Sequence, residues 1–128
     1  MKKLAFVLVA MLALVCTSCK TETSKVTISV KDALGVPVAN RYVIYTDEAS
    51  YIIDAVLPSP EELATDLEEC WEIAETNVAG TVTLDITLAV AKLRYYFEVY
   101  DLGSNKWIEK DVVLHRGVNE TIEFVVNK

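Results

Sequence analysis

The chain has 128 residues, 52% of them apolar, and a formal charge of −7 at pH 7. This length is enough for one domain with a hydrophobic core and too short for two. An acidic chain repels phosphate backbones and anionic headgroups, which argues against nucleic acid as a partner and against electrostatic docking to a membrane.

The chain opens with a short basic segment, Lys2 and Lys3, followed by an unbroken apolar run from Leu4 to Cys16. These 13 residues fit the roughly 7–15 residues of a secretory signal and fall short of the roughly 20 that span a bilayer as a helix. We therefore predict that residues 1–18 are a signal peptide removed on export. The remaining chain has 10 basic and 19 acidic side chains, a formal charge of −9.

The segment Cys16-Thr17-Ser18-Cys19 closes the apolar run and resembles the lipobox of bacterial lipoprotein signal peptides. The resemblance implies that Cys19 carries the lipid and that the protein sits in the cell envelope, anchored to the outer membrane and facing the periplasm or the surface. Cys16 stands where the pattern usually has an aliphatic residue, so secretion without a lipid stays open. The polar stretch that follows makes 19–25 a short tether.

Alternation of apolar and polar residues predicts six short strands in a single domain over 26–128. The clearest alternation is Thr81–Leu88, whose even-numbered residues would face the core. Turn-forming residues separate the strands, a pattern typical of an antiparallel β-sandwich or barrel. We expect the strands over 26–30, 42–46, 81–88, 94–100, 106–114 and 121–126.

Two turn motifs are similar to those of a known family. The residues Asp32, Gly35, Pro37, Val38, Asn40 and Val43 resemble the D-x-x-G-x-P-V-x-N-x-x-V opening of carboxypeptidase-regulatory-like, transthyretin-like domains, and Thr76-Asn77-Val78-Ala79-Gly80 resembles their T-N-x-x-G turn. The resemblance covers roughly residues 26–126 and implies an antiparallel, immunoglobulin-like or transthyretin-like β-sandwich. These motifs specify where the chain bends and not what it binds.

An insertion over 47–77 fills a connection that is usually short in this family. Within it, Ser59-Pro60-Glu61-Glu62 has the cap, the proline and the capping-box glutamate of a helix start. Apolar residues then recur at helical spacing, with seven acidic residues on the remaining face. We predict an amphipathic helix over about 60–75, with Cys70 in its buried stripe, while periodicity does not decide whether Tyr51–Ile53 is a strand.

The aromatic residues concentrate near the C-terminal part of the chain, where Tyr96, Glu98 and Tyr100 face one side of their expected strand and Trp107 lies on the next. Exposed rings of this kind stack on sugars in carbohydrate-binding sandwiches, and Glu98 would bind sugar hydroxyls. The competing interpretation is that the predicted helix packs on Tyr96 and Tyr100. We favour packing, because each large side chain left in water forgoes roughly 1.5–3 kcal/mol.

Motifs for catalysis are weak in this chain. His115 is its only histidine and has no Cys or second His at metal spacing, and the acidic residues lack the spacing of a calcium loop. We therefore expect no catalytic residue, metal or cofactor, with an enzyme as a distant third possibility. The sequence favours a binding or assembly module for another envelope or surface protein, through a sheet edge or the loops Asp47–Leu57 and Asp101–Lys106, over a glycan binder.

Overall fold

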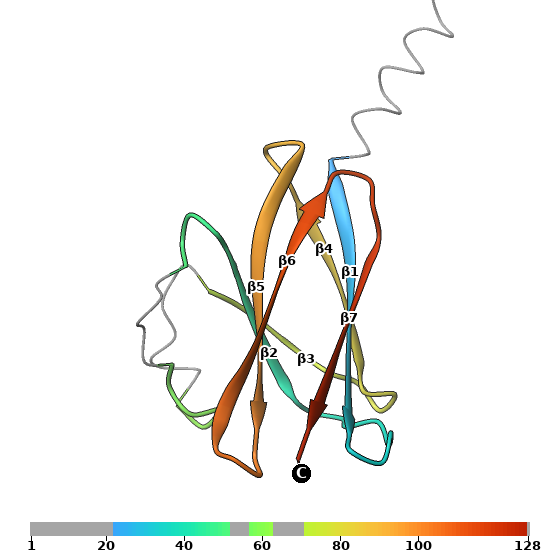
Figure 1. The fold of residues 1–128 in the computed structure, drawn as a ribbon, viewed down its shortest axis with the longest axis vertical. Helices are drawn as coiled ribbons and strands as arrows, with labels where there is room; N and C mark the ends of the chain where they lie inside the picture. The colour runs from blue at the N-terminus through green and yellow to red at the C-terminus, as the bar shows by residue number, and fades with distance from the viewer. Residues whose placement is uncertain (1–21, 52–56, 63–70, 128) are drawn as a thin grey trace, which may run out of the picture.

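The computed structural model describes residues 22–51, 57–62 and 71–127. The described chain is mostly β, with two sheets packed face to face (Figure 1). Its strands are β1 (Thr23–Asp32), β2 (Tyr42–Asp47), β3 (Glu72–Glu75), β4 (Thr81–Thr87), β5 (Lys92–Asp101), β6 (Lys106–His115) and β7 (Glu120–Val126). All six expected strands are present, and β3 is an additional one.

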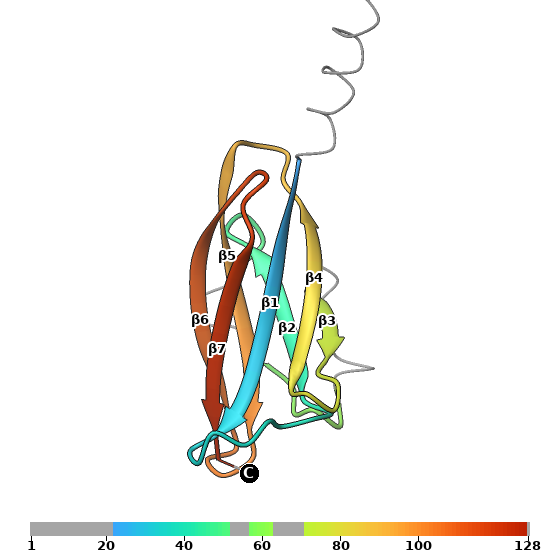
Figure 2. The same ribbon diagram turned by 90° about the vertical axis from the view of Figure 1, so that its right-hand side faces the viewer.

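The three-stranded sheet has the order β4-β1-β7, and the four-stranded sheet has the order β3-β2-β5-β6. Figure 2 shows that β4 and β3 lie on one side of the sandwich, whereas β7 and β6 lie on the other. Every pair is antiparallel except β1 with β7, which is parallel and corrects our expectation of a wholly antiparallel arrangement. The parallel pair arises because the chain crosses from β6 in one sheet to β7 in the other and enters beside the start of β1.

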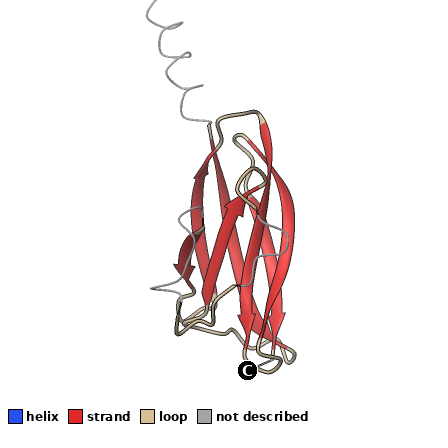
Figure 3. Ribbon diagram, turned by 90° about the vertical axis from the view of Figure 1, so that its left-hand side faces the viewer, coloured by secondary structure: helices blue, strands red, loops and turns tan. Residues whose placement is uncertain are grey.

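The helix expected over 60–75 is wrong at its C-terminal end, because Glu72–Glu75 forms strand β3. These residues pair with Tyr42–Tyr45 of β2, so the backbone groups that the two strands turn toward each other are satisfied by a ladder between distant segments. At the expected helix start, the N–H of Glu62 donates to the carbonyl of Ser59 at 2.9 Å, which closes a turn. Residues 63–70, with Cys70 among them, lie outside the described residues. The described part of the chain contains strands and loops but no helix (Figure 3).

Strand β1 starts at Thr23, three residues before its expected start at Val26. Its first residues are held from both sides: the N–H of Leu88 donates to the carbonyl of Glu22, and the N–H of Gly117 donates to that of Thr23, both at 2.9 Å. Residues 23–25, expected in the tether, therefore belong to the sheet.

The core lies between the two sheets and is built from alternate residues of each strand. Leu84, Ile86 and Leu88 of the clearest alternation are buried, as expected, and Val82 packs partly buried against them. Phe97 and Val99 face the same core from β5, which leaves the intervening residues of β5 on the outer face of the four-stranded sheet. Among the described residues, none forms a helix with the length and apolar character needed to span a membrane.

The turn Thr76-Asn77-Val78-Ala79-Gly80 leads into β4 beside the end of β1. The Thr76 hydroxyl donates to the carbonyl of Val38 at 2.9 Å, and Asn77 Oδ1 accepts the N–H of Ala79 at 2.9 Å. Gly80 has a φ of +71°, and a Cβ at this position would lie only 2.6 Å from the carbonyl oxygen of Val30. Glycine alone fits here without a shift of the backbone, which accounts for the last residue of the motif.

The loop after β1 uses the other motif. Asp32 Oδ1 accepts the N–H groups of Leu34 and Val36, both at 2.9 Å, which folds the chain back on itself. Gly35 has a φ of +82° and Asn40 a φ of +57°, the left-handed conformation that these two residue types tolerate best.

Candidate functional site

The four residues singled out from the sequence lie together on the outer face of the four-stranded sheet. Tyr96, Glu98 and Tyr100 alternate along β5, and Trp107 is the register partner of Tyr100 on β6. The Tyr100 and Trp107 rings meet edge to face with centroids 5.2 Å apart. We call these four residues the outer aromatic face.

Residues of the connection between β2 and β3 cover part of the outer aromatic face. The Tyr51 ring stacks on Tyr96, with centroids 3.8 Å apart and planes 11° from parallel. The indole N–H of Trp107 donates to the carbonyl of Pro58 at 3.0 Å. Trp71, 5% exposed, packs beside them against Ile44. Tyr96 is therefore covered by Tyr51, a residue outside the predicted helix, whereas residues 63–70 of that helix, which were expected to pack on Tyr96 and Tyr100, lie outside the described residues.

Two carboxyl groups lie among these rings. Glu98 is 6% exposed and stands directly opposite Glu109 on β6. Burial first, and then the Glu109 carboxylate and its hydrogen bond to Glu98, raise the pKa of Glu98 to about 7. The Tyr51 hydroxyl donates to Glu109 Oε2 at 2.5 Å, and this hydrogen bond, with burial, raises the pKa of Tyr51.

Two buried polar atoms near this face have no hydrogen-bond partner among the described residues: Glu98 Oε2 and the Trp71 indole nitrogen. The first accepts and the second donates, and both lie over the part of the sheet centred on Ile44, the register partner of Glu98. Leaving such groups unpaired costs stability, so this face is held together by ring packing more than by hydrogen bonding.

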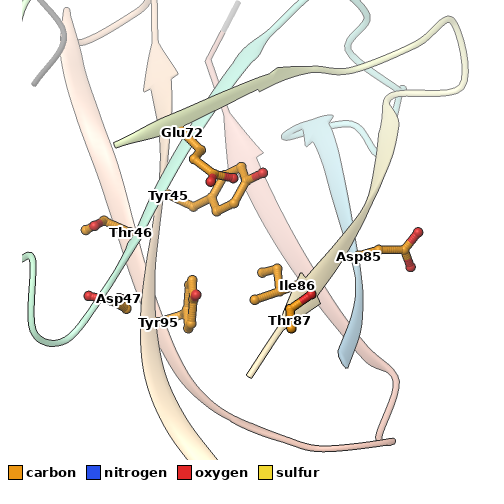
Figure 4. Close-up of a pocket in the computed structure, with 8 residues that line it drawn as sticks. All are labelled: Tyr45, Thr46, Asp47, Glu72, Asp85, Ile86, Thr87 and Tyr95. Carbon is orange, nitrogen blue, oxygen red and sulfur yellow. The ribbon is translucent and has the colours of Figure 1, made fainter. Parts of the chain in front are cut away.

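A second feature, missed from the sequence, is a groove of about 280 Å³ between the two sheets on the side of β3 and β4. Figure 4 shows Tyr45, Asp47, Glu72 and Tyr95 on its four-stranded wall, facing Ile86 on the opposite wall. Its lining comprises Tyr45, Thr46, Asp47, Glu72, Asp85, Ile86, Thr87 and Tyr95, and we call it the acidic groove. The groove depends on which strands end up at the edges of the two sheets, and no local pattern in the sequence indicates that.

The electrostatics of the acidic groove are negative. Burial, a hydrogen bond to Glu72 and the Glu72 charge raise the pKa of Tyr45, and burial with the charges of Asp47 and Glu72 raises the pKa of Tyr95. Both phenols therefore stay neutral beside two carboxylates, a combination of anionic groups and ring faces that favours a cation. Asp85 lines the rim, with its carboxylate turned away from the tyrosines (Figure 4).

The remaining candidates carry little chemistry. His115 is the last residue of β6 and is exposed. Within residues 22–51, 57–62 and 71–127, no group of three or more His, Cys, Asp or Glu side chains is arranged to hold a metal ion. Cys19, the expected lipid acceptor, lies outside the described residues.

The chain was also compared with known proteins. No protein-family model matches it, and a search of the curated proteins finds no match.

Proposed function

We propose that the protein is a lipid-anchored envelope protein whose carboxypeptidase-regulatory-like, transthyretin-like sandwich is a non-catalytic binding module for another envelope or surface protein. The signal-like segment ending at Cys19 supports the anchor. The turns at Asp32–Val43 and Thr76–Gly80, whose side chains make the hydrogen bonds given above, support the family.

The observation that best supports a protein partner is that β4 lies at the edge of its sheet. It is paired with β1 on one side only among the described strands, and the acidic groove opens beside it. An unpaired edge offers a row of backbone N–H and C=O groups to another chain, and this is a recurrent way in which proteins recognise extended segments.

The anchor is tested by the mass and location of the intact protein. We expect wild-type protein from membranes to lack residues 1–18 and to carry a diacylglycerol, and Cys19→Ser to leave the membrane fraction. Two acyl chains hold a protein stably where one does not. Membrane-bound protein of unprocessed mass would contradict the anchor.

The binding role is tested by chemical crosslinking in intact cells, followed by native purification. We expect one protein partner to be crosslinked reproducibly to the wild type. Leu34→Ala, at an exposed position in the loop after β1, serves as the control and should keep the same crosslink. Absence of any crosslinked protein, with the lipid anchor intact, would contradict a protein-binding module.

A glycan is the second candidate partner, and one observation favours it. Tyr42 lies on β2 one position beyond the Val43–Val99 pair, so the register places it beside Tyr100, which is itself paired with Trp107. Three rings, exposed or half-buried, thus form a row across three strands. Binding on a glycan array that is lost in Trp107→Ala and kept in Leu34→Ala would favour this candidate.

A further inference from the structure

We infer that β4 and the acidic groove form a strand-addition site for an extended basic segment of the partner protein, whose Lys or Arg side chains enter the groove. This inference rests on the proposed binding function. It specifies which edge is used and the chemistry of the segment that the edge takes.

The direction of the backbone groups along β4 follows from the ladder with β1. The N–H of Val30 donates to the carbonyl of Gly80, and the N–H of Leu88 donates to that of Glu22, so the even-numbered residues of β4 bond to β1. The N–H and C=O groups of Thr83, Asp85 and Thr87 therefore point to the open side. Thr81 is already used, because its carbonyl accepts the N–H of Asn77.

The other edges are protected in ways that β4 is not. The ammonium of Lys110 on β6 donates to the carbonyl of Glu123 on β7, which bridges those two edges. Strand β3 has only four residues. Strand β4 has seven residues, a single charged residue, Asp85, and no Lys or Pro, the residues that usually block edge pairing.

The acidic groove selects the side chains of the added strand. Side chains alternate between the two faces of a strand, so every second residue of a segment paired with β4 would point between the sheets. There it would meet Asp47 and Glu72 and the rings of Tyr45 and Tyr95 on the opposite wall (Figure 4). A Lys or Arg pairs with the carboxylates and packs its aliphatic stem on the rings, whereas a Glu would be repelled.

The test uses the intact lipoprotein in detergent and a fluorescein-labelled heptapeptide of alternating lysine and valine. Fluorescence anisotropy should show saturable binding that weakens with added salt. The same peptide with glutamate in place of lysine should not bind. A lysine peptide N-methylated on alternate backbone nitrogens should bind at least about tenfold more weakly, because its hydrogen bonds to β4 are removed.

Protein variants separate the backbone from the groove. Thr83→Pro removes one N–H that points to the open side and should weaken peptide binding about tenfold or more. Val113→Pro is the matched control on β6, since the bond from the Arg116 N–H to the Ala91 carbonyl sets the register in which the Val113 N–H also points away from its partner strand. It should change binding less than about twofold. The double variant Asp47→Asn/Glu72→Gln should weaken binding about tenfold and remove most of the salt dependence.

Several results would overturn the inference. Equal binding of the lysine and glutamate peptides would remove the charge selection, and full binding of the N-methylated peptide would remove strand addition even if Thr83→Pro failed to fold. If the wild type binds no peptide and instead forms a dimer that Thr83→Pro disrupts, the strand added to β4 would come from a second copy of this chain. In cells, loss of the crosslinked partner in Thr83→Pro supports the inference, whereas an unchanged crosslink overturns it and leaves the proposed binding function in place.

Discussion

Glu98 and Glu109 face each other directly across β5 and β6, two carboxyl groups in register beneath Tyr51. Like charges at such positions repel, and Glu98 is also buried, so the folded protein favours Glu98 in its protonated form.

Because of this pair, we expect the folded protein to become less stable as the pH rises. The pKa of Glu98 is raised from 4.5 to about 7, so the folded state keeps a proton that the unfolded chain has lost. The stability that this proton contributes is complete below about pH 4.5 and is lost as the pH rises through about 7. We expect Glu98→Gln to reduce the difference in Tm between pH 5 and pH 8. We also expect it to raise Tm at pH 8 by about 4–8 °C, measured by circular dichroism. An unchanged difference in Tm between pH 5 and pH 8 in Glu98→Gln would contradict this.

The burial of Trp71 indicates that this side chain anchors the connection between β2 and β3 to the sheet. Its side chain is buried against Ile44 and meets the Tyr51 ring at a centroid distance of 6.1 Å. Trp71→Ala should lower the free energy of unfolding by about 3 kcal/mol, measured by urea denaturation. Val78→Ala, at a position that is 92% exposed, should change it by less than about 0.5 kcal/mol. Similar values for the two variants would mean that Trp71 does not anchor this connection.

Gly35 and Gly80 both have a positive φ but differ in the space around them, so their alanine variants can be compared directly. A methyl group on Gly35 would point into open space, whereas a Cβ on Gly80 would meet the Val30 carbonyl at 2.6 Å. Gly35→Ala should cost about 1 kcal/mol of unfolding free energy for its left-handed backbone alone. Gly80→Ala should cost about 2 kcal/mol more, because the backbone of β1 or β4 must also shift. Equal urea midpoints for the two variants would show that the close approach at Gly80 relaxes without cost.

The hydrogen bonds to the Asp101 carboxylate predict that the folded protein loses stability in acid. Burial opposes its ionisation, but hydrogen bonds from the Asn127 N–H, the Ser104 hydroxyl and the Gly103 N–H outweigh burial and lower the pKa of Asp101 below 3.8. Its contribution to stability is therefore present above about pH 4 and is lost as the pH falls through the lowered pKa. Asp101→Asn should cost about 1–3 kcal/mol of unfolding free energy at pH 7 and much less at pH 2, by urea denaturation. An equal cost of Asp101→Asn at pH 7 and at pH 2 would contradict this.

The strands were predictable where one face is apolar and the other polar. Thr81–Thr87 alternates without exception, so its local pattern and its burial agree. The stretch Glu72–Glu75 is too short to show a period of its own, and the spacing of Trp71 and Ala74 fits a helix as well as a strand. Its conformation is decided by β2, since Ile73 and Ala74 pair with Ile44 and Val43. A contact between segments about 30 residues apart leaves no mark on local periodicity.

The candidate sites were likewise predictable where strand alternation decides them and not where contacts between distant segments do. Strand alternation alone placed Tyr96, Glu98 and Tyr100 on one face, and the structure has them there. That Tyr51 would be the ring covering Tyr96 depends on the path of a long loop. The acidic groove could not be predicted, because Glu72 joins Asp47 and Tyr95 on one wall only when β3 pairs with β2, and the facing wall forms only when β4 becomes the neighbouring edge of the other sheet.

The early start of β1 would limit the distance between the domain and a membrane if Cys19 carries the proposed lipid. With Cys19 lipidated, as proposed, only three residues separate the lipid from Thr23, a reach of about 10 Å. The strands run along the long axis of the domain (Figure 1), so the end of the sandwich that carries Thr23, with Lys92 and Arg116 beside it, would be the end nearest the lipid headgroups. The Asp101–Lys106 turn would then lie at the end of the domain farthest from the lipid, and a segment added to β4 would run between these two ends.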